Sequence, residues 1–179
     1  IKKIKELHNS SFHTLQTLNP IKIKKYLQNE NPEVIFTEAF RVYDMLWTVV
    51  AKKLNIKVYG FQHGFEIMSV YYKPGIVLSK FKKVVRIVVG LYHLSRLVNK
   101  KFLKMLFRYY SYFFKGTSLR SPEFESNLLF PDQFFIYSEY YRSFWIKKLH
   151  LSKDGMIVTG PPDLMLVKDI KKKPKTNSF

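Results

Sequence analysis

A histidine placed shortly after an apolar stretch is the residue of this sequence best suited to catalysis. His63 closely follows residues 56–61, which are rich in β-forming side chains, and Gly64 lets the backbone turn sharply and approach a substrate. An imidazole with an ordinary pKa of about 6.5 can remove a proton from an attacking hydroxyl or donate a hydrogen bond to developing phosphate charge. We therefore predict that His63 is catalytic; the alternative is a histidine that only caps the end of a strand.

Two acidic residues and a glutamine could complete such a site. Glu38 follows another short apolar stretch by two residues, so its carboxylate could orient His63 or act as the base itself. The alternative for Glu38 is a first-turn residue that complements a helix dipole, with Thr37 as the helix cap. Gln62 and Glu66 flank His63 and are predicted to bind acceptor hydroxyls; the alternative for both is simple solvation.

A further polar pair stands at the start of an amphipathic helix predicted near residues 138–149. Ser138 and Glu139 follow the strand-like residues 134–137. The first amides of such a helix can hold a phosphate oxygen, so the pair is a candidate substrate contact. Capping of the helix by Ser138 explains the pair equally well without a ligand.

Two predicted β-α-β units position these residues. Residues 34–36 and 56–61 are typical of strands in a parallel sheet, and residues 41–55 between them carry apolar side chains at helical spacing. The second unit has its strands at 134–137 and 156–159. Open parallel sheets bind ligands at the carboxyl ends of their strands, where the candidate residues would meet. The predicted fold class is α/β, an open and mostly parallel Rossmann-like sheet flanked by helices.

Residues 79–115 combine an apolar helical periodicity with a strong excess of basic side chains. No acidic residue occurs between Glu66 and Glu123, and the whole chain has 31 Lys and Arg against 13 Asp and Glu, a net charge of +18. We predict a long helix or a helical hairpin here, broken at Gly90 or at Asn99. The nearly apolar run within it is shorter than the roughly 20 residues that a membrane-spanning helix requires.

The charge of this segment favours an anionic partner. Together with its aromatic residues it predicts a basic amphipathic surface that lies on an anionic bilayer, with the rings at headgroup level. The alternative is that the apolar stripe belongs to the core and the lysines form an ordinary solvated surface. The residues predicted to face the membrane are Lys82, Lys83, Arg86, Lys100, Lys101, Lys104 and Arg108.

The order of these motifs resembles that of a known group of transferases. One strand ends in Phe-Gln-His-Gly at residues 61–64, a later strand enters Ser138-Glu139, and Thr-Gly-Pro-Pro follows at residues 159–162. Over about residues 31–165 the chain is similar to the N-terminal, acceptor-side half of GT-B-type glycosyltransferases of bacterial surface polysaccharide synthesis, including the CDP-glycerol glycerophosphotransferase-like group. Gln62 stands where the glycerophosphotransferases tend to have Trp.

The resemblance implies an acceptor-side domain over residues 1–165 with a helical insertion at about 79–115. Residues 166–179 would be a Lys-rich linker or tail towards a donor-binding domain outside this chain, so the chain alone would be inactive. The implied reaction moves a sugar or polyol-phosphate from a nucleotide-activated donor to a glycan or lipid-linked acceptor, as in capsule, teichoic-acid-like or lipopolysaccharide synthesis. The donor is then a substrate, and no separate cofactor or metal is expected.

The absence of Cys excludes disulfides, thiolate zinc sites and a cysteine nucleophile within this sequence. It fits a cytoplasmic protein, and we expect peripheral association with the inner face of the plasma membrane. Two other functions stay open. A basic nucleic-acid-binding module would use the same charges and rings, although no RRM, KH or zinc signature occurs. A relative of UDP-N-acetylglucosamine 2-epimerase would share the two-domain fold and isomerise the sugar instead of transferring it.

Overall fold

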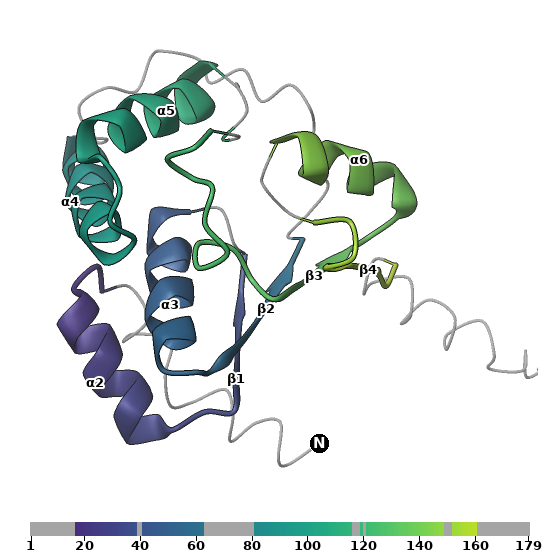
Figure 1. Ribbon diagram of the computed structural model, residues 1–179, viewed down its shortest axis with the longest axis horizontal. Coiled ribbons are helices and arrows are strands. Elements are labelled where there is room, and N and C mark those ends of the chain that lie inside the picture. Colours follow the sequence, from purple (N-terminus) through teal and green to yellow (C-terminus); the bar gives the residue numbers. More distant parts are fainter. Residues whose placement is uncertain are drawn as a thin grey trace, which may run out of the picture.

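The chain folds into an α/β structure in which helices pack against a parallel sheet (Figure 1). Within the described residues there are five helices and one four-stranded sheet. This confirms the α/β class and the parallel sheet that were predicted from the sequence. The computed structural model describes residues 17–38, 41–62, 81–115, 119, 121–148 and 152–160.

The strands lie in the sheet in the order in which they occur in the chain. They are β1 (Val34–Thr37), β2 (Lys57–Phe61), β3 (Gln133–Ile136) and β4 (Met156–Val158), and each neighbouring pair is parallel. Each strand begins and ends within one residue of its predicted bounds. The order of the described strands never reverses, so the switch point that marks the ligand crevice of doubly wound sheets is not among them.

Helix α2 (Pro20–Glu30) precedes the sheet and packs on α3. The side chain of Asn19 accepts hydrogen bonds from the N–H groups of Ile21 at 2.9 Å and Lys22 at 3.4 Å, which caps the helix. Pro20 occupies the first turn, where its missing N–H has no partner to lose. An Asn-Pro pair is therefore a sequence signal for a helix start, and the structure shows one there.

Helix α3 (Val42–Lys53) joins β1 to β2 and contributes the largest share of the core. It begins after Arg41, which has an extended backbone and makes no side-chain capping bond. The interpretation of Thr37 and Glu38 as the cap and first turn of this helix is therefore wrong. Thr37 continues the ladder instead, where it pairs with Gly60 of β2.

The basic segment forms two helices, α4 (Phe81–Leu97) and α5 (Phe102–Lys115). Asn99 separates them in a left-handed conformation with φ of 54°, so the predicted break at Asn99 is confirmed. The alternative break at Gly90 is wrong. Gly90 lies inside α4, where a Cβ atom would come within 2.5 Å of the Val42 side chain, so the glycine permits close packing of α4 on α3.

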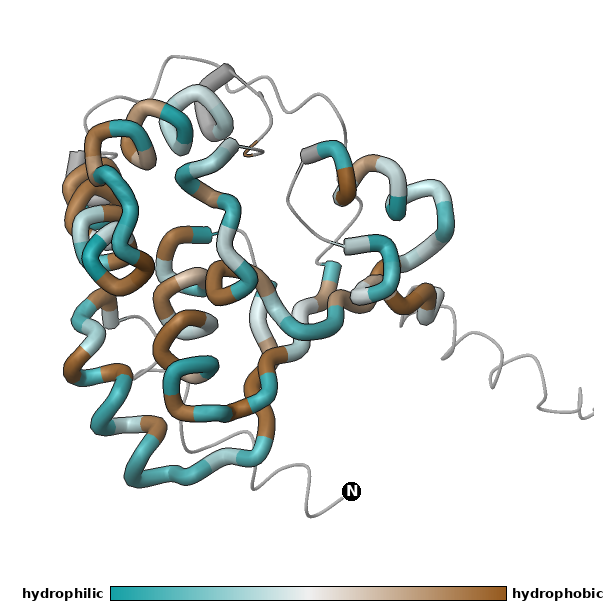
Figure 2. Tube along the Cα trace, in the orientation of Figure 1, coloured by the Kyte–Doolittle hydropathy of each residue, from teal (hydrophilic) through white to brown (hydrophobic). Residues whose placement is uncertain are grey.

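The last helix, α6 (Glu139–Lys148), connects β3 to β4. Its Trp145 is buried and meets the Phe134 ring edge-on at 5.3 Å, so this amphipathic helix packs its apolar side against the sheet. Val58 and Ile136 belong to the same buried side of the sheet. Figure 2 shows apolar residues concentrated on α3, α4 and the strands.

The other face of the sheet carries a row of aromatic rings. Tyr59 contacts Phe36 at 5.7 Å and Phe135 at 5.8 Å, both edge-on. Phe36 is 62% exposed, and Phe61 and Ile157 are also exposed. The two faces therefore differ, because the described helices that form the core pack on the opposite one.

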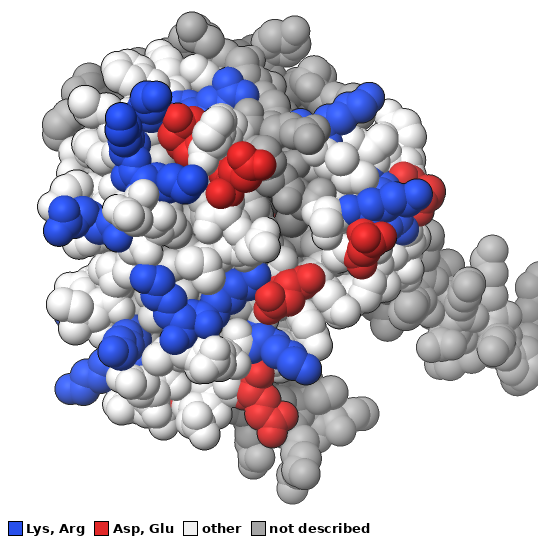
Figure 3. All heavy atoms as spheres, viewed as in Figure 1, with Lys and Arg blue, Asp and Glu red and all other residues white. Residues whose placement is uncertain are grey.

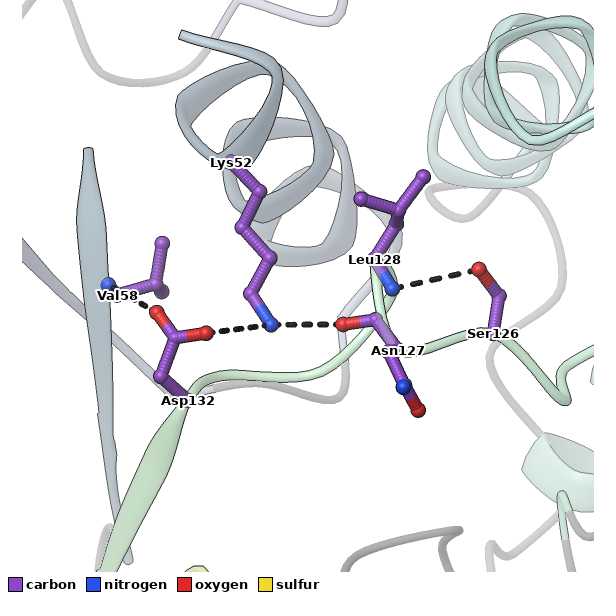
Figure 4. A network of polar contacts seen from close by, with 6 residues as sticks. All are labelled: Lys52, Val58, Ser126, Asn127, Leu128 and Asp132. Atoms are coloured by element: carbon purple, nitrogen blue, oxygen red, sulfur yellow. Dashed lines mark hydrogen bonds and ion pairs between the residues drawn. The ribbon is translucent and has the colours of Figure 1, made fainter. Parts of the chain in front are cut away.

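A polar network at the amino ends of the strands fixes the return of the chain into β3 (Figure 4). The ammonium of Lys52 lies 2.9 Å from the Asp132 carboxylate and donates a hydrogen bond of 2.7 Å to the carbonyl of Asn127. Asp132 in turn accepts from the N–H of Val58 at 2.9 Å and donates its own N–H to the Val58 carbonyl at 2.8 Å. Helix α3, β2 and the segment before β3 are thereby joined at one point.

Candidate functional site

The carboxyl ends of the strands bring the described candidate residues to one edge of the sheet. Glu38 directly follows β1, Gln62 directly follows β2, and Ser138 comes second after β3. Because all strands are parallel, these three positions share an edge. The remaining candidates His63, Gly64 and Glu66 lie outside the described residues, although His63 is the next residue after Gln62.

Gln62 has a structural task at this edge. Its side chain is 1% exposed, and its carbonyl oxygen accepts a hydrogen bond from the N–H of Tyr137 at 3.2 Å. Its backbone N–H donates to the carbonyl of Phe135 at 2.9 Å. The residue therefore ties the end of β2 to the end of β3 immediately before His63. Its predicted contact with acceptor hydroxyls stays a prediction.

Glu38 belongs to a charged cluster at the end of β1. Its carboxylate lies 2.9 Å from the guanidinium of Arg41, and the Glu38 side chain is only 20% exposed. The same guanidinium donates to the Tyr43 hydroxyl at 2.6 Å and lies 5.9 Å from the centre of that ring. Arg41 thus orients Glu38 from one side, so that the carboxylate has a fixed position at the edge.

Asp44, in the first turn of α3, is the functional candidate that the sequence reasoning missed. Burial, together with the charge of Glu38, raises the pKa of Asp44 to about 7, against the lowering effects of Arg41 and of hydrogen bonds from the Arg41 N–H and the Thr37 hydroxyl. One of its oxygens is buried with no hydrogen-bond partner in the described structure. The signal in the sequence was a single acidic residue in an otherwise apolar or basic helix.

The carboxylates of Glu38 and Asp44 are suited to acid–base chemistry. Two interacting carboxylates favour sharing a proton, and one that titrates near neutral pH can accept or release it there. Arg41 lies against both, through its side chain for Glu38 and its backbone N–H for Asp44. The pair could therefore act on a hydroxyl that reaches the carboxyl end of β1.

Helix α5 reaches this cluster through Tyr109. The Tyr109 side chain is 4% exposed, and burial raises the pKa of its hydroxyl, opposed by a hydrogen bond with the backbone of Val42 and reinforced by the charge of Asp44. The ring is thus held at the start of α3, next to the carboxylates. Helix α5 consequently lies close to the edge that carries the candidate residues.

The Ser138-Glu139 pair stands at the start of α6. The carbonyl of Ser138 accepts a hydrogen bond from the N–H of Tyr141 at 3.1 Å, which marks the first turn. Glu139 is 69% exposed and lies 2.6 Å from the Arg142 guanidinium. Arg142 also donates to the carbonyls of Lys153 and Met156, so Glu139 is linked to the segment that enters β4. These contacts lie within the chain, and both the capping by Ser138 and the phosphate contact stay predictions.

Helices α4 and α5 present an apolar surface in addition to the one they bury. Leu91 and Met105 are fully buried, whereas Leu103 and Phe107 are 62% and 68% exposed. Core packing therefore explains only part of the apolar residues in this segment. The exposed apolar residues of the two helices are Val84, Val85, Val89, Tyr92, Leu103, Phe107 and Tyr110.

Basic side chains accompany this surface. Arg86, Lys101 and Lys104 are exposed, and the ammonium of Lys100 donates to the carbonyl of Pro122 at 2.9 Å. On the face shown in Figure 3, Lys and Arg outnumber Asp and Glu. The side chains of Lys82 and Lys83 lie outside the described structure.

Neither a membrane span nor a metal centre is found among the described residues. None of the described helices combines the length and the apolar character that crossing a bilayer requires. Within the same residues, no three His, Cys, Asp or Glu side chains gather where they could hold a metal ion. In comparisons with protein-family models, curated proteins and solved structures, no match was found for this chain.

Proposed function

We propose that this chain is the acceptor-side domain of a transferase that moves a sugar or polyol-phosphate from a nucleotide-activated donor to a surface-glycan acceptor. In this proposal the parallel sheet is one half of a GT-B fold, and α4 and α5 are a helical insertion in it. The observation that carries the proposal is the carboxylate pair of the half-buried Glu38 and the desolvated Asp44 at the carboxyl end of β1. That is the edge at which parallel α/β sheets bind their ligands.

The proposed chemistry is a proton transfer coupled to a substitution. The oxygen of an acceptor hydroxyl attacks the anomeric carbon or the phosphorus of the donor and forms a new bond there. The bond to the nucleotide phosphate breaks, and the nucleotide leaves with the electron pair. The hydroxyl proton passes to His63 or to Glu38. The guanidinium of Arg41, 2.9 Å from the Glu38 carboxylate, orients the latter.

Asp44 allows this proton transfer to take place near neutral pH. A carboxyl group with a pKa of about 7 beside Glu38 is partly ionised under physiological conditions, so a proton can move between the two groups. Gln62 contributes by holding the strand end that leads into His63. In this proposal Glu38, Asp44 and His63 exchange protons, and Gln62 positions the strand end before His63.

The second part of the proposal is peripheral attachment to an anionic membrane through α4 and α5. Their exposed apolar side chains would enter the headgroup region, while the neighbouring lysines contact anionic lipids, each worth about 1 kcal/mol. Because Tyr109 anchors α5 next to Asp44, this attachment would bring a lipid-linked acceptor close to the candidate site.

The decisive experiment measures transfer from nucleotide-activated sugars and polyols by the longest protein that contains this chain, with glycan and lipid-linked acceptors. We expect His63→Ala to lower turnover by about 10² to 10⁴ and Glu38→Gln by at least about tenfold. Glu30→Gln is the matched control, because Glu30 is exposed at the end of α2. Near-wild-type turnover in both site variants contradicts the proposal.

Two further results of the same assay would redirect the assignment. Consumption of the sugar nucleotide without any acceptor indicates isomerisation, as in the 2-epimerases. Tight binding of duplex or single-stranded nucleic acid with a steep salt dependence, in the absence of any transfer, indicates a nucleic-acid-binding module.

A further inference from the structure

An open groove of about 340 Å³ lies between α5 and the segment that precedes β3. Such a volume is at the lower end of small-molecule sites, which span roughly 300–1,000 Å³. It suits a phosphorylated polyol or a single headgroup. The residues that line the groove are Lys104, Phe107, Arg108, Ser111, Ser121 and Glu123.

Helix α5 supplies the cationic wall. Lys104, Arg108 and Ser111 recur at helical spacing, so they follow one side of the helix. The Lys104 side chain is 63% exposed, and its ammonium lies 4.0 Å from the Glu123 carboxylate. That distance is too long for a hydrogen bond, so this contact leaves the donors of Lys104 available to a ligand.

The opposite wall is held in place by contacts outside the groove. Phe124 is fully buried, and its N–H donates to the carbonyl of Ser121 at 2.9 Å, which forms a turn. The ammonium of Lys100 binds the carbonyl of Pro122 between them. The wall is therefore fixed against the beginning of α5 without using Lys104.

The charges in the groove favour an anion. The pKa of Glu123 is lowered by a hydrogen bond from its own backbone N–H, against the raising effect of burial. Ser121, Lys104 and Lys100 lower the pKa further, so this carboxylate is ionised at neutral pH. This carboxylate lies in the lining beside two cationic side chains, Lys104 and Arg108. Residues 81–115 contain no acidic side chain, whereas the opposite wall also carries Glu125, so the positive charge at the groove comes from the α5 side.

We propose that this groove binds a phosphate group, as a monoester or a diester. Lys104 contributes a point charge, and Arg108 contributes a planar guanidinium that matches phosphate oxygens. The Phe107 ring, which is 68% exposed, provides an apolar wall for the group that carries the phosphate. The phosphate comes from a lipid headgroup or from a soluble polyol phosphate. Only the lipid source rests on the proposed membrane attachment.

The test compares two lysines of the same segment. Binding of inorganic phosphate and of glycerol 3-phosphate is measured by calorimetry for the wild-type protein, Lys104→Gln and Lys101→Gln. Both variants lose one positive charge. Lys101→Gln is the control, because Lys101 is exposed just before α5 and does not line the groove. We expect Lys104→Gln to weaken binding by roughly 10- to 100-fold, the loss of a charged hydrogen bond, and Lys101→Gln by less than about twofold.

A third variant tests the opposite sign. Glu123→Gln removes the carboxylate from the groove, so we expect phosphate to bind several-fold more tightly. If only net charge mattered, the two lysine variants would weaken phosphate binding equally, and Glu123→Gln would strengthen it by the same factor. Equal weakening by the two lysine variants, or no phosphate binding by the folded wild-type protein, overturns the proposal.

Vesicles identify the source of the phosphate. Sedimentation with phosphatidylglycerol vesicles and with neutral phosphatidylcholine vesicles is measured for the same variants. If Lys104→Gln weakens vesicle binding far more than Lys101→Gln, the groove takes a lipid headgroup. If only the soluble phosphates discriminate between the two variants, the groove takes a soluble phosphate. Both readouts are independent of transfer, so failure of the transferase assignment leaves them interpretable.

Discussion

The side-chain carbonyl of Gln62 accepts a hydrogen bond from the backbone N–H of Tyr137 at 3.2 Å, although the two residues lie 75 positions apart in the sequence. The bond joins the ends of β2 and β3 just before His63. Because the Gln62 side chain is buried, its loss leaves the N–H of Tyr137 without this partner. The end of β2, just before His63 in the sequence, is therefore tied to β3 by a contact between two distant parts of the chain.

We expect Gln62→Ala to lower the free energy of unfolding by about 1–3 kcal/mol, because a buried hydrogen bond is lost. Gln133→Ala is the control, since Gln133 is an exposed glutamine on β3, and we expect a change of about 0.5 kcal/mol or less. Urea denaturation of the three proteins measures the difference. Equal stability of the two variants would show that the Gln62 bond contributes nothing.

Asp44 should make stability fall as the pH rises. Below pH 3.8 the folded and unfolded chains both hold the proton; between pH 3.8 and about 7 the unfolded chain releases it first. The folded state then binds more protons, so its stability decreases with pH, by about 4 kcal/mol over the full range.

Asp44→Asn removes this dependence, so the stability of the variant relative to the wild type should improve between pH 4 and pH 8. The free energies of unfolding of both proteins, measured across this range, test the expectation. Asp154→Asn is the control, because Asp154 is exposed and should leave the wild-type profile unchanged. Parallel profiles for the wild type and Asp44→Asn would contradict the raised pKa.

Asp132 should have the opposite dependence on pH. Burial raises its pKa, but the Lys52 ammonium and the N–H of Val58 outweigh this effect and lower the pKa below the ordinary value. Its contribution to stability is therefore present above the ordinary pKa of an aspartate and is lost as the pH falls through the lowered one. Acidification weakens the link between α3 and the start of β3.

At neutral pH we expect Asp132→Ala to destabilise the fold by about 1–3 kcal/mol, because it removes the acceptor of Val58 and the partner of the largely buried Lys52. Asp132→Asn keeps an oxygen for Val58 and should cost less. Thermal unfolding of the two variants beside Asp154→Ala separates these contributions. A greater loss in the asparagine variant would refute this account of the network.

The exposed leucine on α5 provides a test of membrane attachment. Leu103→Asp should weaken binding to phosphatidylglycerol vesicles by more than about tenfold, since it places a charge where an apolar side chain would enter the headgroup region. Ile21→Asp makes the same change on α2, at a residue that is 78% exposed. Sedimentation that falls equally for both variants would assign the effect to net charge alone.

The strands and helices could be predicted because their signals are local. Asn19 and Pro20 start α2 as their chemistry requires, and the apolar runs give each strand to within one residue. Local signals were not sufficient where two elements compete for the same residue. Thr37 can cap a helix or extend a strand, and pairing with Gly60 decides for the strand. A glycine such as Gly90 can break a helix or allow another helix to pack closely, and the contact with Val42 shows that it allows close packing.

The candidate site was predictable only in part. The rule that ligands bind at the carboxyl ends of strands selected Glu38 and Gln62, and both lie at that edge. The pattern did not indicate that Arg41 would hold Glu38, or that burial would change the acidity of Asp44. The burial of Asp44 arises only when distant elements pack at the start of α3, where Tyr109 of α5 also lies.

The long excursion between β2 and β3 also bears on how the protein folds. β1, α3 and β2 are close in sequence and can assemble early, whereas the Val58–Asp132 bond joins residues 74 positions apart. Closing so large a loop is slow, because its entropy must be lost before any distant pairing forms. Until then one edge of β2 has no neighbour and can recruit a strand from another molecule. Refolding yield should therefore fall steeply with protein concentration.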